Sequence, residues 1–166
     1  HPPLIEASAA YKQAPGPRCQ PALGGGDGHG SEATKAAAAA SPAADAIKFL
    51  GFVPDRELPD LYRSAHCMVY PSLFEGFGLP PVEAMACGIP VISSTRGALE
   101  EVVADAALTI DPEDVPDLTN ALTRFAAEPA LAADLRTKGL ANAARFHWQR
   151  TAAQVTAVYA KAAARP

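Results

Sequence analysis

The stretch Cys67–Ser93, CMVYPSLFEGFGLPPVEAMACGIPVIS, decides the fold class of this chain. It begins with a short apolar strand, Cys67–Tyr70, continues through a loop with two glycines, and ends in a second strand, Pro90–Ser93. Between the strands the sequence predicts a compact helix over Pro80–Cys87, ended by Gly88 in the position that favours a left-handed cap. A strand, a helix and another strand in this order predict a unit of parallel sheet.

The same alternation of strand and helix continues along the rest of the chain. Two more short runs, rich in β-branched or aromatic residues, are predicted as strands, Ile47–Leu50 and Ala107–Ile110. The spacing of apolar residues predicts further helices over Asp55–Ala65, Asp114–Ala127, Pro129–Arg145 and Gln149–Ala164. The sequence therefore predicts an α/β fold with a parallel sheet.

The first 46 residues have a less regular pattern. Pro3–Gln13 is predicted as a helix, but Gln20–Leu23, where a strand should follow, offers little to pair because Pro21 lacks a ladder donor. The glycine-rich run Gly24–Gly30 fits neither the dinucleotide-binding pattern nor a P-loop, since the glycine register fails and no Gly-Lys-Ser/Thr follows. We therefore expect residues 1–46 to be loosely held or partly irregular.

Composition and charge exclude several classes of protein. The 166 residues suit one domain, and the net charge of −4 argues against a nucleic-acid-binding stripe of Lys and Arg. No apolar run approaches the roughly 20 residues of a transmembrane helix. Cys19, Cys67 and Cys87 form no CxxC pair, and no histidine stands at metal-ligand spacing around them. The sequence therefore predicts no metal site, and three reduced cysteines in a cytosolic protein.

The loop that precedes the Pro80–Cys87 helix has the features of an anion-binding site. Its glycines let a ligand approach the backbone closely and leave several N–H groups free to point at it. These are the N–H groups of Gly76, Phe77, Gly78 and Leu79. The helix N-terminus adds partial positive charge, and ligands bind at the carboxyl ends of parallel strands in open α/β sheets.

Two carboxylates flank this loop, since Glu75 enters it and Glu83 follows one turn into the helix. A carboxylate does not itself hold a phosphate, but it accepts hydrogen bonds from hydroxyl groups. A nucleoside diphosphate sugar, with a phosphate centre between hydroxylated rings, would satisfy all these groups together. Two plainer interpretations stay open: Glu83 as an acid that complements the helix dipole, and Glu75 as a solvated loop acid.

The segment Glu75–Ile92 resembles the Glu-x7-Glu signature of retaining glycosyltransferases of the GT-B fold, above all the large family 4 group of bacterial enzymes. Three further blocks resemble the same family, namely Phe49–Val53, Gly97–Val102 and Asp105–Pro112. Together the resemblance spans residues 47–163. It implies that the chain is the second domain of a GT-B fold, a three-layer, Rossmann-like parallel sheet with helices on both faces, with its first strand missing or degraded.

The resemblance also implies the parts of a donor site. Glu75 would be the catalytic residue at the donor sugar, and Glu83 would bind the ribose hydroxyls. The other site residues would be the backbone amides of Gly76, Phe77 and Gly78 at the sugar and phosphate, Leu79 against the nucleoside, and Val53 and Asp55 beside the base. Asp55 is equally a natural N-cap for the following helix. The family works by front-face attack without a protein nucleophile, and neither a metal nor another cofactor is expected.

The resemblance further divides the chain. Residues 1–46 would be the incomplete start of the Rossmann-like domain, residues 47–147 its nucleotide-sugar-binding core, and residues 148–166 a helix that crosses to an N-terminal, acceptor-binding domain. The family's Arg–Lys pair, which grips the diphosphate, would precede His1. We therefore expect the chain alone to bind nucleotide weakly and not to transfer sugar. Its last helix would offer apolar side chains for self-association, namely Val155, Val158 and Tyr159.

The expected donor is GDP-mannose, because the Phe-Glu-Gly-Phe-Gly sequence of residues 74–78 is frequent in mannosyl- and rhamnosyltransferases. The acceptor, whether a sugar, a lipid or another molecule, stays open, and the full-length enzyme is expected in the cytoplasm or peripherally at the inner membrane face. One alternative is a degenerate, non-catalytic nucleotide-binding or interaction domain, motivated by Pro21 and the alanine run 36–40. Another is a different GT-B enzyme, such as a nucleotide-sugar epimerase or a phosphorylase, although the lysines stand in unsuitable contexts for pyridoxal.

Overall fold

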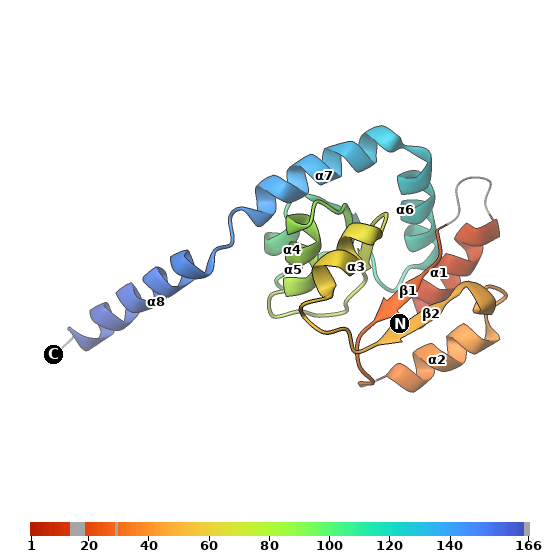
Figure 1. The fold of residues 1–166 in the computed structure, drawn as a ribbon, viewed down its shortest axis with the longest axis horizontal. Coiled ribbons are helices and arrows are strands. Elements are labelled where there is room, and N and C mark those ends of the chain that lie inside the picture. The colour runs from red at the N-terminus through yellow and green to blue at the C-terminus, as the bar shows by residue number, and fades with distance from the viewer. Residues whose placement is uncertain (14–18, 29, 165–166) are drawn as a thin grey trace.

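The computed structural model describes residues 1–13, 19–28 and 30–164 of the chain, in which helices and short strands alternate (Figure 1). The helices are α1 (Pro2–Gln13), α2 (Ser31–Ala40), α3 (Leu58–Ser64), α4 (Leu79–Ala86), α5 (Leu99–Val103), α6 (Val115–Ala127), α7 (Pro129–Ala143) and α8 (Trp148–Ala163), with a 3-10 turn, η1, at Ala44–Ala46. The strands are β1 (Ala22–Gly24), β2 (Lys48–Gly51), β3 (Met68–Tyr70), β4 (Val91–Ser94) and β5 (Ala107–Ile110). The helices and strands that the sequence predicts are present, with small shifts at their ends.

The strands form two groups, and both are parallel. In one, β3, β4 and β5 make a three-stranded sheet in that order, with Met68 opposite Val91 and Ser94 opposite Ile110. In the other, β1 pairs with β2. No pairing joins the two groups within the part of the chain that the structure describes. The parallel pairing confirms the predicted class of sheet.

Helices cover both faces of the β3–β4–β5 sheet. Along β4, Val91 packs into a core cluster with residues of α4, α5 and α7, such as Met85 and Leu99. The next residue, Ile92, packs into a second cluster with residues of α1 and α6, such as Leu118. Because successive side chains of a strand point to opposite faces, this sheet is the middle of three layers, as predicted.

The start of the chain includes a strand that the sequence argued against. α1 packs on α6 and buries Ala7 in the second core cluster. β1 forms beside β2, so the expectation that Gln20–Leu23 offers little to pair is wrong. Pro21 does not prevent the pairing because it stands just ahead of the strand, a position where proline is tolerated, and its carbonyl accepts a hydrogen bond from Lys48 N at 3.0 Å. The division of the chain at residues 46 and 147 stays a prediction.

The C-terminus of α4 is closed by the glycine that the sequence assigned to it. Gly88 has a φ of 74°. Its N–H donates to Met85 O at 2.9 Å, and the N–H of Ile89 donates to Ala84 O at 2.9 Å. This pair of hydrogen bonds is the Schellman arrangement, so the predicted left-handed cap is confirmed.

α3 begins later than predicted. Its N-cap is Glu57, which makes no side-chain capping bond. Ahead of it, Pro54 O accepts hydrogen bonds from the N–H groups of Glu57 (2.8 Å) and Leu58 (3.3 Å), so a turn occupies the first predicted residues of the helix. The interpretation of Asp55 as the N-cap of this helix is therefore wrong.

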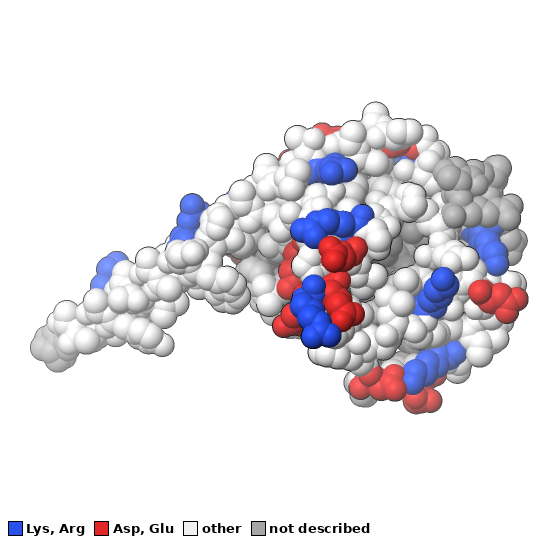
Figure 2. All heavy atoms as spheres, in the orientation of Figure 1, with Lys and Arg blue, Asp and Glu red and all other residues white. Residues whose placement is uncertain are grey.

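α8 stands apart from the body of the molecule and projects into solvent (Figure 1), with residues 148–164 all exposed. Its exposed apolar side chains include Val155, Val158 and Tyr159. On the face drawn in Figure 2, basic and acidic side chains are mixed over the body, whereas α8 shows basic ones alone. Among the described residues, no helix combines the length and apolar character needed to cross a bilayer.

Candidate functional site

The loop between β3 and α4, residues 71–78, leads from the carboxyl end of the strand into the N-terminus of the helix. Four successive backbone amides, three at the end of this loop and one at the first residue of α4, donate no hydrogen bond to any described residue; they belong to Gly76, Phe77, Gly78 and Leu79. A helix N-terminus adds partial positive charge at such a place. The loop can therefore offer a row of donors to an anion, as the sequence predicted.

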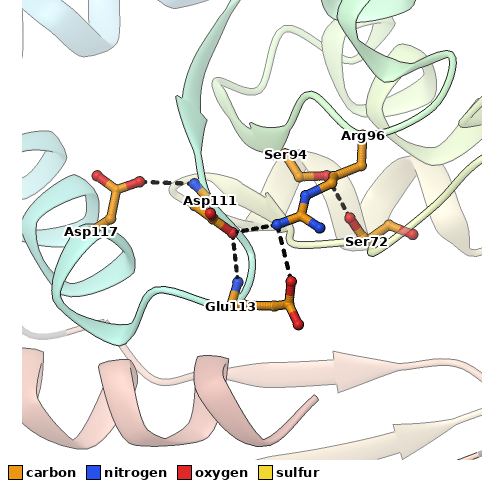
Figure 3. Close-up of polar contacts among 6 residues, drawn as sticks. All are labelled: Ser72, Ser94, Arg96, Asp111, Glu113 and Asp117. Carbon is orange, nitrogen blue, oxygen red and sulfur yellow. Dashed lines mark hydrogen bonds and ion pairs between the residues drawn. The ribbon is translucent and has the colours of Figure 1, made fainter.

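Glu75 is held by hydroxyl groups. Its Oε1 accepts hydrogen bonds from Tyr70 Oη at 2.6 Å and from Ser72 Oγ at 2.9 Å. Ser72 is itself held, because the buried Ser94 donates to the Ser72 carbonyl at 2.6 Å (Figure 3). Both donors use the same carboxylate oxygen, and no described residue donates to Oε2. Oε2 is therefore open to a further hydrogen-bond donor.

The backbone of Glu75 is fixed as well. Its carbonyl accepts a hydrogen bond from Ala98 N at 3.0 Å, and the residue forms a parallel bridge with Gly97. Gly97 has a φ of 66°, and a Cβ at this position would lie 2.5 Å from the Glu75 carbonyl oxygen. Only glycine fits there, so the segment after β4 supports the loop that carries Glu75.

Glu83 lies on the exposed face of α4. Its Oε2 accepts a hydrogen bond from Tyr62 Oη of α3 at 3.0 Å. The ring of Tyr62 packs against the first core cluster, which anchors the hydroxyl. The structure thus places a carboxylate with a tyrosine partner both before and after the row of open amides.

Both tyrosine hydroxyls keep their protons at neutral pH. Burial raises the pKa of Tyr62 and of Tyr70 well above the ordinary value of about 10, and the hydrogen bonds to Glu83 and Glu75 raise each pKa further. A protonated hydroxyl donates to a carboxylate, which accepts. In each tyrosine–glutamate pair the hydroxyl is therefore the donor of the hydrogen bond and the carboxylate is the acceptor.

We expect the chain to lose stability as the pH rises above about 10. In the unfolded chain tyrosine ionises near its ordinary pKa, whereas Tyr62 and Tyr70 in the folded chain hold their protons to higher pH. The unfolded state then binds fewer protons, so the free energy of unfolding falls by at most about 1.4 kcal/mol per pH unit for each tyrosine. Urea unfolding at a series of alkaline pH values, followed by circular dichroism, measures this slope.

The double variant Tyr62→Phe/Tyr70→Phe should flatten that decline. A residual slope is expected from Cys67, since burial raises the pKa of its thiol to about 12. The same slope in the variant and the parent chain would contradict the assignment of the two hydroxyls.

A second polar cluster lies at the carboxyl ends of β4 and β5 (Figure 3). The Arg96 guanidinium is paired with Asp111 at 2.9 Å and with Glu113 at 3.0 Å. Asp117 in turn accepts a hydrogen bond from Asp111 N at 2.8 Å. These contacts tie the loop after β4 to the loop after β5. Because Arg96 precedes Gly97, the cluster also anchors the segment that supports the β3–α4 loop.

Two apolar side chains lie at the rim of the β3–α4 loop. Phe77 packs edge-on against Phe146, with ring centroids 5.5 Å apart and an interplanar angle of 85°. Phe146 stands between α7 and α8, so the loop touches the point where α8 departs. Leu79 is exposed at the first turn of α4 and free to meet an apolar part of a ligand.

The sequence-predicted base contacts lie beside α3. A shallow hollow is lined by Leu50, Phe52, Val53, Pro54, Glu57 and Leu61. Val53 is therefore part of a depression, whereas Asp55 is exposed in the turn and does not line it. Leu61 precedes Tyr62 in α3, and the Tyr62 hydroxyl donates to Glu83. The same helix therefore borders the hollow and contacts Glu83.

Sequence reasoning missed the residues that hold the two glutamates. Tyr70 ends a predicted strand, where ligands bind in parallel sheets, and that position was a usable signal. Ser72 stands inside the stretch that carries the site, close enough to Glu75 for a local hydrogen bond. Tyr62 and Ser94 gave no such signal, because their partners lie more than 20 residues away: Glu83 for Tyr62 at a separation of 21, and Ser72 for Ser94 at 22.

No metal-binding group is found within residues 1–13, 19–28 and 30–164, since no three His, Cys, Asp or Glu side chains are arranged around a common point. Cys19, Cys67 and Cys87 are free thiols. The raised pKa of Cys67 keeps it protonated and unreactive at neutral pH. Independence of metal stays a prediction.

One family model, Glycosyl transferases group 1, matches residues 2–161. O-antigen chain mannosyltransferase B of Escherichia coli is 42% identical over 113 residues, which are 68% of this chain and 30% of that protein. MMP alpha-(1->4)-mannosyltransferase of Mycolicibacterium hassiacum is 46% identical over 115 residues, which are 67% of this chain and 28% of that protein. The chain thus spans less than a third of the length of these relatives.

Solved structures show the same fold. Sucrose-phosphate synthase from Thermosynechococcus elongatus matches 97% of this chain, and 42% of its own, with a TM-score of 0.84 and 32% identity. The Anabaena protein HepE, solved in complex with UDP and glucose, matches 96% of this chain and 44% of its own with a TM-score of 0.83; at 24% identity that likeness concerns the fold alone. The chain belongs to the glycosyl transferases group 1 family and has the fold of the C-terminal, Rossmann-like domain of GT-B glycosyltransferases.

Proposed function

We propose that this chain is the donor-binding part of a retaining glycosyltransferase that moves a hexose from a nucleoside diphosphate sugar to an acceptor. The observation that carries the proposal is the row of open amides at residues 76–79, with Glu75 and Glu83 before and after it. Open amides at a helix N-terminus suit a diphosphate. Carboxylates with a free oxygen suit the hydroxyls of the rings on either side.

Each part of the donor would meet a different element. The sugar hydroxyls would bind Glu75, which we take as the catalytic residue, and the phosphates would bind the amides of Gly76, Phe77 and Gly78. Glu83 would accept from the ribose hydroxyls. The nucleoside would lie against Leu79, and the base would enter the hollow beside α3 that includes Val53. Asp55 would border the base from the exposed turn outside the hollow.

Catalysis in this proposal is stabilisation of the leaving diphosphate. As the bond to the sugar breaks, negative charge grows on the phosphate oxygens, and preoriented amides lower the energy of that charge without reorganising. Glu75 would hold the sugar so that an acceptor hydroxyl attacks from the face that the diphosphate leaves and gives its proton to the departing phosphate oxygen, which retains the anomeric configuration. No metal is proposed for these steps.

The proposed donor is GDP-mannose. Support comes from the sequence of residues 74–78 and from two relatives named as mannosyltransferases, at 42% and 46% identity. A UDP-sugar is the competing donor, since HepE was solved with UDP and glucose. A direct comparison of the two nucleotides decides between them.

We further propose that the isolated chain binds the donor but does not transfer sugar. Acceptor binding would reside in another part of a longer protein, and α8 would cross to that part; the chain matches 30% of the length of the Escherichia coli relative. The exposed apolar side chains of α8 would otherwise favour self-association. Measurable transfer by the chain alone would contradict this.

The alternative of a degenerate, non-catalytic domain loses the two features that motivated it. It rested on Pro21 and on the alanine run 36–40. β1 forms in spite of Pro21, and the alanines lie in α2. Neither feature now argues for decay of the domain.

Titration of UDP, GDP and ADP against the chain tests the proposed function. GDP should bind most tightly, and Glu83→Ala should weaken that binding at least about tenfold, because a charge-assisted hydrogen bond to the ribose is lost. Glu6→Ala, which removes an exposed glutamate from α1, is the matched control and should leave binding unchanged. If no nucleotide binds, or if Glu83→Ala binds as the parent chain does, the site is wrongly assigned.

A further inference from the structure

Each of the two glutamates of the proposed donor site is held by a tyrosine from a neighbouring element. Tyr70, the last residue of β3, donates to Glu75 Oε1 at 2.6 Å, and Tyr62 of α3 donates to Glu83 Oε2 at 3.0 Å. We propose, as a step that rests on the proposed function, that both tyrosines are positioning residues. Tyr70 orients the carboxylate that meets the sugar, and Tyr62 orients the carboxylate that meets the ribose.

The contacts of Glu75 restrict its carboxylate to one orientation. Tyr70 and Ser72 both donate to Oε1, which fixes the rotation of the group about its last bond. The hydrogen bond from buried Ser94 to the Ser72 carbonyl keeps Ser72 in place. A side chain that is already ordered loses less conformational entropy when a ligand binds, so Tyr70 and Ser72 strengthen binding without touching the ligand.

Glu83 depends on Tyr62 in a simpler way. Its side chain extends from the exposed face of α4, and Tyr62 is the described residue that donates to it. The hydroxyl is presented by a ring that packs on the core, so its position is fixed by packing. α3 also supplies Leu61 to the adjoining hollow. Tyr62 therefore links the proposed base site to Glu83, the carboxylate proposed to bind the ribose.

The two pairs make different demands on the ligand. Glu75 would contact the sugar, a part that a free nucleoside diphosphate lacks, whereas Glu83 would contact the ribose, a part that every nucleotide donor has. Loss of the Tyr70 hydroxyl should therefore weaken binding of the nucleotide sugar and spare the nucleotide. Loss of the Tyr62 hydroxyl should weaken both to the same degree.

The test is calorimetric titration of Tyr70→Phe and Tyr62→Phe, made in the full chain, with GDP, GDP-mannose, UDP and UDP-glucose. We expect Tyr70→Phe to weaken the better-bound nucleotide sugar by about three- to tenfold, the effect of one lost hydrogen bond, and its nucleoside diphosphate less than about twofold. Tyr62→Phe should weaken both members of the pair by about three- to tenfold. Tyr159→Phe, which removes an exposed hydroxyl from α8, is the matched control and should change neither.

A generally disordered site would not produce this pattern, since it would weaken both probes in both variants alike. Ser72→Ala provides a second route to the same group, because it removes the other donor to Glu75 Oε1 and should reproduce the selective loss seen with Tyr70→Phe. If Tyr70→Phe weakened binding of the nucleotide sugar and the nucleotide equally, or of neither, the positioning role of Tyr70 would be overturned and the proposed function would stand. Absence of binding by the parent chain would instead contradict the proposed function, and the assignment with it.

Discussion

Gly97→Ala is expected to lower the free energy of unfolding by about 2–4 kcal/mol, from backbone strain and overpacking together. Gly97 has a φ of 66°, a region that an alanine enters only at a cost. The added Cβ would also lie 2.5 Å from the carbonyl oxygen of Glu75, which is backbone and cannot rotate away. The segment after β4 must shift, and the parallel bridge to Glu75 must open with it.

Urea unfolding followed by far-ultraviolet circular dichroism measures this loss. Gly28→Ala is the matched control, because a Cβ there meets no atom within 4 Å and the residue lacks a positive φ. A glycine replaced in an open position changes stability by about 1 kcal/mol or less. Equal stabilities of the two variants would mean that Gly97 does not brace the loop.

Leu99→Ala should cost about 2–5 kcal/mol, the range for a buried leucine that leaves a cavity. Leu99 is 0% exposed at the start of α5 and belongs to the first core cluster. It also lies directly against Gly78, where a Cβ would stand 2.5 Å from Leu99 Cδ2. The cavity would therefore open beneath the β3–α4 loop, so nucleotide binding should weaken as well.

The matched control for this prediction is Leu140→Ala on α7. Leu140 is 46% exposed, so its truncation should change the free energy of unfolding by about 0.5 kcal/mol or less. Denaturant unfolding and nucleotide titration of both variants measure the two effects. Full stability of Leu99→Ala would contradict the predicted cavity. Normal nucleotide binding despite lost stability would show that packing of Leu99 in the core does not support the β3–α4 loop.

The features of the fold that follow from local pattern were predictable. The alternation that placed β4 after α4 depends on apolar runs of fixed period, and Gly88 marks a helix end by its own conformation. The open amides at residues 76–79 follow from two glycines placed ahead of a helix. All of these signals lie within a few residues of the structure they determine.

Features that depend on distant neighbours were not predictable. The hydroxyl of Tyr62 meets Glu83 only because α3 and α4 pack together, and nothing near Tyr62 in the sequence indicates this. Pairing with β2 likewise decides that Ala22–Gly24 is a strand, against the local signal of Pro21. The ion pairs of Arg96 with Asp111 and Glu113 arise because the ends of two adjacent strands meet.

The isolated position of α8 has an optical consequence. The single tryptophan of the chain, Trp148, lies in the first turn of this helix and is 78% exposed. Indole emission follows the polarity of its surroundings, so in the folded chain it already reports water and changes little when the sheet unfolds. A surface that covered α8 would shift the emission to shorter wavelengths. The molecule thus contains an intrinsic fluorophore for the docking of its last helix, and not for the melting of its core.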